Sequence, residues 1–195
     1  MVRYADDFVC SFQYEEEAQS FYKALQQRLA KFGLEIAENK TKIIPFGKNA
    51  DEQCRLNGTK KPPMFDFLAF THYCSKSKTG RFRVKRKTSR KKMSAKLKES
   101  KEWLKANQHM EIKVLIDKLR RSLKGYYNYY CITDNISEVA NFQDKIQHYL
   151  FKWLNRRSQQ RSFNWNKYIL FMKKYPLPKP KVNIYDLRSE INYFL

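Results

Sequence analysis

The apolar residues of the chain change their spacing near residue 88, and this change limits the folds that the chain can adopt. Before it, short apolar segments alternate with turn residues, which is typical of strands and hairpins. After it, apolar residues recur every three or four positions, which predicts amphipathic helices. The expected helices cover residues 93–104, 112–126 and 139–154. We therefore expect an α+β fold in which a mixed part precedes an all-helical part.

The mixed part is expected to contain two hairpins and one helix. Residues 2–12 predict a strand, a turn and a returning strand, and residues 15–33 predict an amphipathic helix. Residues 34–46 look extended, with a short strand at Ile43 and Ile44, and residues 47–63 are polar enough to predict a loop. Further strands are expected at 65–70 and, after a turn at Gly80, at 81–85. In the helical part, residues 162–175 predict a fourth helix before the prolines.

The charge is as unevenly distributed as the apolar spacing. Residues 1–70 carry ten basic and ten acidic side chains, whereas residues 71–195 carry thirty and nine, so the whole net charge of +21 lies in the second part. Such an excess indicates a polyanionic partner, either nucleic acid or, as the less favoured alternative, an acidic membrane surface. The densest run of basic residues, 76–92, has an alternative interpretation as a solvated linker.

Targeting and cysteine patterns point to the cytoplasm, with nucleoid association in a bacterium. The longest runs without Asp, Glu, Lys or Arg have nine residues, whereas a membrane-spanning helix needs about 20 apolar residues. The start of the chain does not resemble a secretory signal. The four cysteines are scattered without metal-ligand spacing, so we expect neither a zinc site nor disulfides.

The sequence Tyr4-Ala5-Asp6-Asp7 places two adjacent carboxylates at the tip of the first predicted hairpin. Two ionised carboxylates this close repel each other, and a hard cation such as Mg²⁺ offsets the repulsion. Carboxylates of this kind hold the metals of two-metal phosphoryl transfer. The alternative is an ordinary polar turn, in which Asp is common.

Aromatic and basic side chains are interleaved in the second part of the chain. Four tyrosines occur within residues 126–130, just after Arg120, Arg121 and Lys124. Tyr126 and Tyr130 share a helix face that suits the core, while Tyr127 and Tyr129 are candidates to stack on unpaired bases. Core packing remains the alternative for all four. The residues predicted to bind RNA are Lys85, Arg86, Lys87, Arg90, Lys91, Lys92, Arg120, Arg121, Lys124, Tyr127, Tyr129, Arg156, Arg157 and Arg161.

Several motifs, in order, resemble the reverse transcriptases encoded by group II introns. Residues 2–9 resemble the catalytic hairpin, 32–42 the next palm motif, and 65–70 the primer-grip strand, although Ala69 stands where the family usually has glycine. The helical remainder resembles the thumb and maturase domain. Its marks are Gly125-Tyr126-Tyr127-Asn128-Tyr129-Tyr130, Trp153-Leu154-Asn155-Arg156-Arg157 and Ser162-Phe163-Asn164-Trp165.

The resemblance implies a division into the end of a palm over 1–87, a helical thumb and maturase domain over 88–180, and a tail over 181–195. It implies that Asp6 and Asp7 are catalytic magnesium ligands, and that Lys40, Lys42, Phe67 and Leu68 contact nucleotide or primer. The expected partners are structured intron RNA and, in a complete enzyme, a DNA target or primer.

The resemblance also implies a function in intron splicing and in RNA-directed DNA synthesis for intron mobility. The family's fingers and a further catalytic Asp would precede Met1, so this chain alone is expected to have no polymerase activity. Two alternatives stay open: an RNA-binding module without enzymatic activity, and part of a retron-type reverse transcriptase. The tyrosine-rich segment and the Phe163-Asn164-Trp165 tail argue against the retron type.

Overall fold

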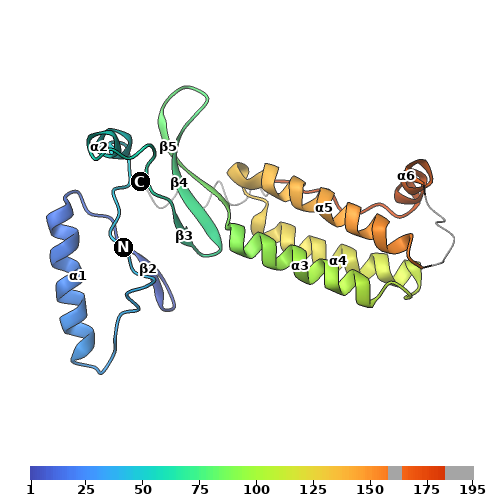
Figure 1. Cartoon of the computed structure of the whole chain (residues 1–195), viewed down its shortest axis with the longest axis horizontal. Coiled ribbons are helices and arrows are strands. Elements are labelled where there is room, and N and C mark those ends of the chain that lie inside the picture. The colour runs from blue at the N-terminus through green and yellow to red at the C-terminus, as the bar shows by residue number, and fades with distance from the viewer. Residues whose placement is uncertain (158–163, 183–195) are drawn as a thin grey trace. The chain divides into compact units, whose positions relative to one another are not determined.

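The computed structural model describes residues 1–157 and 164–182, and the chain divides into two compact units, Met1–Lys85 and Arg86–Leu195 (Figure 1). The expected α+β class is confirmed: helices and two small antiparallel sheets occupy the first part, and helices the second. In the described part of the chain, no helix is long and apolar enough to cross a membrane.

The first unit begins with the predicted hairpin. Strands β1 (Val2–Tyr4) and β2 (Asp7–Val9) pair antiparallel, with Tyr4 opposite Asp7, so that Ala5 and Asp6 form the turn. Helix α1 (Glu15–Ala30) follows, with three glutamates in its first turn that complement the helix dipole. Although α1 shows the expected amphipathic spacing, no residue is buried within this fully described helix.

Two predictions for the middle of this unit are wrong. The described residues 41–46 contain no strand, and the expected loop at 47–63 contains a short helix, α2 (Ala50–Leu56). Ala50 and Cys54 are one helical turn apart and both are buried, so burial of this pair favours a helix in a segment that is otherwise polar.

The second sheet has the strand order β3-β4-β5, formed by β3 (Phe65–Phe67), β4 (Phe70–Lys76) and β5 (Phe82–Thr88). The expected hairpin around Gly80 is confirmed. The expected single strand at 65–70 is instead two strands joined by a turn at Leu68 and Ala69, because both residues adopt positive φ, +48° and +66°. This is the backbone of a tight hairpin turn, which glycine or asparagine would adopt with less strain.

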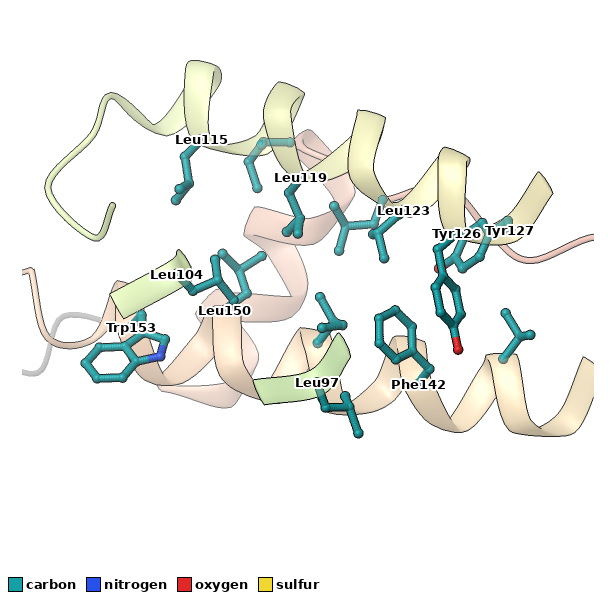
Figure 2. Packing of buried hydrophobic residues seen from close by; sticks show 14 of the residues in the cluster. Leu97, Leu104, Leu115, Leu119, Leu123, Tyr126, Tyr127, Phe142, Leu150 and Trp153 are labelled. Carbon is teal, nitrogen blue, oxygen red and sulfur yellow. The ribbon is translucent and has the colours of Figure 1, made fainter. Parts of the chain in front are cut away.

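The second unit is built on three long helices, α3 (Arg90–Ala106), α4 (Ile112–Tyr130) and α5 (Ile136–Leu154), with a 3₁₀ turn at Thr133–Asn135 before α5. A shorter helix, α6 (Trp165–Lys174), confirms the predicted fourth helix, although residues 162 and 163 of the predicted range lie outside the described residues, as does most of the predicted tail. The predicted apolar positions form one core, as Figure 2 shows for α4 above α5. Among its members are Leu104 of α3, Leu115, Ile116, Leu119 and Leu123 of α4, Val139, Phe142, Ile146 and Leu150 of α5, and Tyr168 of α6.

Candidate nucleic-acid interface

The tip of the first hairpin carries the two predicted catalytic carboxylates. Asp6 lies in the turn and Asp7 opens β2, and both are exposed. The turn requires a positive φ of +51° at Ala5, and the Arg3 Nε donates a hydrogen bond of 2.9 Å to the Ala5 carbonyl oxygen. The backbone is thus fixed so that two successive residues at the tip present carboxylates to solvent.

These carboxylates form a partial donor set for a hard cation. No group of three or more His, Cys, Asp or Glu side chains suited to hold a metal occurs in residues 1–157 and 164–182. Mg²⁺ commonly binds through only one or two carboxylates together with substrate phosphates and water. The donor chemistry at Asp6 and Asp7 therefore fits magnesium, and the other ligands of a bound ion would have to come from groups outside this hairpin.

The other predicted contacts of the first unit lie in turns and at strand ends. Lys40 ends a turn in which its own N–H donates to the Ala37 carbonyl oxygen at 2.9 Å, and both Lys40 and Lys42 are exposed. Phe67 is the last residue of β3, and Leu68 is the first residue of the strained turn. The structure thus leaves their predicted roles in nucleotide or primer binding as predictions.

The densest cationic run leads from β5 into α3. Lys85, Arg86 and Lys87 are half-buried in the strand. Arg90, Lys91 and Lys92 are exposed in the first turn of the helix, which also contains half-buried Met93. The first turn of α3 has no acidic residue, whereas the positive end of a helix dipole favours anions there. A phosphate at this place would compensate both the dipole and the repulsion between the cations.

A buried amide fixes the junction from which these cations project. Asn135, which is 0% exposed, accepts a hydrogen bond of 2.7 Å from the backbone N–H of Thr88 on its Oδ1. Its Nδ2 donates to the Thr88 hydroxyl at 2.7 Å and to the Tyr130 carbonyl oxygen at 2.9 Å. The sequence pattern did not single out Asn135, because nothing in an apolar periodicity distinguishes a buried asparagine from a polar cap.

The predicted cations of α4 differ in their surroundings. Arg120 donates from Nη1 to Asp117 at 2.9 Å and from Nε to the Pro176 carbonyl oxygen at 2.9 Å, so it ties α4 to the segment after α6. Arg121 and Lys124 are exposed, and Arg121 makes a longer hydrogen bond of 3.4 Å to the Asp117 carbonyl oxygen. Arg121 and Lys124 therefore remain better candidates for phosphate contact than Arg120.

Of the two tyrosines predicted to be available for stacking on bases, only one is exposed. Tyr129 is 51% exposed, but Tyr127 is only 6% exposed and belongs to the core, so the expectation that Tyr127 reaches outward is wrong. The reason is helical spacing: Tyr127 lies one turn after buried Leu123 and one turn before buried Cys131, on a core stripe wider than the pattern suggested. The phenol oxygen of Tyr127 has no hydrogen-bond partner among the described residues.

Burial also shows in the pKa values of these phenols. Burial raises the pKa of Tyr126 to about 12, and a hydrogen bond with the Thr88 side chain acts in the opposite direction. Tyr126 stacks on Phe142 with ring centroids 4.1 Å apart, as expected for a core residue. Burial likewise raises the pKa of Tyr127 and of Tyr168.

The three arginines after α5 have different positions. The Arg156 guanidinium lies over the Trp153 ring, 4.9 Å from its centroid, and Arg156 is exposed. Arg157 donates from Nη1 to the Met110 carbonyl oxygen at 2.7 Å, which gives it a structural role. Arg161 lies outside the described residues.

Comparison with protein families assigns both parts of the chain. The family model described as reverse transcriptase (RNA-dependent DNA polymerase) matches residues 1–72. The model described as group II intron, maturase-specific domain matches residues 90–171, which run from the first residue of α3 to Phe171 in α6. No curated protein and no solved structure matches the chain.

Together, the two matches place a reverse-transcriptase part and a group II intron maturase-specific part in one chain. The chain belongs to the reverse transcriptase and maturase family encoded by group II introns. Nucleic acid is thereby its general class of partner, and Mg²⁺ is the metal that reverse transcriptases generally use.

Proposed function

We propose that this chain binds structured intron RNA through the cationic surface of its helical unit and thereby favours the splicing-competent RNA fold. One observation carries the proposal. The maturase-specific match covers the same unit in which the first turn of α3 has no acidic residue and is surrounded by cationic side chains. Phosphate contacts from several such side chains give affinity that depends steeply on salt.

We further propose that Asp6 is a magnesium ligand of RNA-directed DNA synthesis in a complete reverse transcriptase site, with Asp7 as its supporting neighbour. The support is the paired exposed carboxylates at the hairpin tip and the match of this region to reverse transcriptases. Bound magnesium would neutralise phosphate charge in phosphoryl transfer. DNA target or primer would then be a second nucleic-acid partner.

Fluorescence anisotropy with a labelled group II intron RNA tests RNA binding, and a transfer RNA serves as the structured control. We expect tighter binding to the intron RNA and a linear fall of log affinity with log salt. Asp6→Ala should leave this binding unchanged, because Asp6 lies in the other unit. Equal binding of both RNAs, or affinity that does not depend on salt, would contradict the proposal.

A splicing assay tests the functional part. Intron RNA should splice at a lower magnesium concentration when the chain is added, and Lys91 and Lys92 replaced together by glutamine should reduce the effect. Lys101 and Lys105, on the same helix and also exposed, provide the matched control pair. If the chain does not change splicing at any magnesium concentration, the proposed maturase role is refuted.

A further inference from the structure

A groove lies at the surface between α3 and α4, where the core residue Tyr126 forms part of its lining. Its volume is about 490 Å³, which is within the range of sites that hold a small ligand. Both walls belong to the helical unit. Its lining includes Lys92 and Ala95 of α3, and Arg121, Ser122, Gly125 and Tyr130 of α4.

Gly125, in the middle of α4, lines the groove without a side chain. Glycine destabilises a helix interior by up to about 1 kcal/mol relative to alanine. Neither strain nor crowding requires glycine here: a Cβ at position 125 would meet no atom within 4 Å, and Gly125 is not among the residues with positive φ. The backbone of α4 at Gly125 is therefore not covered by a side chain of its own, and a larger residue could be placed there.

The rim of the groove is positively charged. Lys92 and Arg121 stand on opposite walls and both are exposed. Lys96 and the acidic Glu99 also line the groove, and because they pair with each other at 2.7 Å their charges offset. In the part of the chain that the structure describes, Lys92 forms no ion pair with an acidic side chain. The two exposed cations thus give the groove a net attraction for phosphate.

We infer that this groove binds a short unpaired segment of RNA, with phosphates at Lys92 and Arg121 and a sugar or base over Gly125 against Tyr130. The inference rests on the proposed RNA-binding function and names the form of RNA that this groove takes. A base can stack on an aromatic side chain only when it is not held inside a duplex, so a contact with Tyr130 favours an unpaired strand. Aromatic rings beside cations are the usual platform for unpaired bases.

Filling the groove tests the inference directly. Gly125→Leu adds bulk to the lining while it improves helix propensity, and Ala106→Leu adds bulk at an exposed position of α3 outside the groove. Anisotropy is measured with a labelled 12-nucleotide uridine oligomer and with an RNA hairpin duplex. We expect Gly125→Leu to weaken oligomer binding about tenfold, with little change for the duplex or for Ala106→Leu.

A charge variant keeps the test valid if Gly125→Leu perturbs the fold, which circular dichroism would reveal. Lys92→Gln should reduce the salt slope of oligomer binding by about 0.7, the value for one phosphate contact to a single strand. Lys101→Gln is the control. Lys101 lies nine residues after Lys92, which is about two and a half helical turns, so it is on the opposite side of α3.

The outcomes separate the two proposals. If the unmodified chain binds intron RNA while folded Gly125→Leu and Lys92→Gln bind the oligomer as their controls do, the groove inference fails and the proposed function stands. If duplex binding falls as much as oligomer binding, the assignment to unpaired RNA is overturned. If the unmodified chain binds no RNA, both proposals fail.

Discussion

Asn135 holds together the junction between β5 and α3, so its replacement by alanine should destabilise the helical unit. The amide is 0% exposed and makes three hydrogen bonds, of which two join Thr88 and one joins the Tyr130 carbonyl oxygen. Thr88 is itself buried, at 5% exposed, so water cannot readily replace the lost partner of its backbone N–H.

The expected loss follows from these contacts. An unsatisfied buried N–H costs about 1–3 kcal/mol, and each remaining hydrogen bond contributes about 0.5–1.5 kcal/mol. The Tyr130 carbonyl oxygen keeps a second donor, the Ile132 N–H at 2.9 Å, so its loss is at the lower end. We expect Asn135→Ala to lower the free energy of unfolding by about 3 kcal/mol.

Urea denaturation followed by tryptophan fluorescence measures this change in the correct unit, because the only tryptophans, Trp103, Trp153 and Trp165, all belong to the helical unit. Asn128→Ala is the matched control: the same substitution at an exposed position of α4 should change stability by less than about 0.5 kcal/mol. If Asn135→Ala is no more destabilising than Asn128→Ala, the hydrogen-bonded junction does not stabilise the unit.

Three further results are expected. Tyr127→Phe should leave the stability of the helical unit unchanged or raise it by about 1 kcal/mol in urea denaturation, because it removes a buried hydroxyl that has no hydrogen-bond partner in the described residues. A loss above 1 kcal/mol would contradict this. The contribution of Tyr126 to stability should be constant below about pH 10 and be lost above it, because an unfolded tyrosine ionises near 10 while the folded pKa of Tyr126 is about 12; Tyr126→Phe should therefore make the alkaline loss of stability less steep. Ala69→Gly should slow amide hydrogen exchange in the β3–β4 hairpin, since glycine relieves a φ of +66°, and faster exchange would refute this.

The helical unit was predictable because its apolar residues follow a single rule. Residues three or four apart share a helix face, and the apolar faces of α4 and α5 contribute to one core. The periodicity predicted α3, α4, α5 and α6 at nearly their observed positions. It failed for Tyr127 because spacing shows where a stripe lies but not how much of the helix circumference neighbouring elements cover.

The first unit was predicted less well for a physical reason. Helix α2 and the Leu68–Ala69 turn each depend on one or two local contacts rather than on a repeated pattern. Nonglycine residues at positive φ give no signal in a sequence, because their side chains suggest a continuing strand. The carboxylate hairpin was predictable because its turn is short, Val2 and Tyr4 alternate with Arg3 before it, and apolar residues follow it.

In the helical unit, the side chains proposed to bind nucleic acid are different from those that stabilise the fold. Its core is closed by apolar side chains of α3, α4, α5 and α6, whereas Lys91, Lys92, Arg121 and Lys124 lie on exposed surface. Exposed charges contribute little to folding, and like charges crowded together oppose it. Replacing them should therefore weaken nucleic-acid binding without destabilising the fold. Arg120 and Arg157, which bind carbonyl oxygens of the chain itself, should instead affect stability when replaced. The exposed cations that the fold does not need are therefore the ones we propose to contact phosphate, and this split between stability and binding is what the paired variants measure.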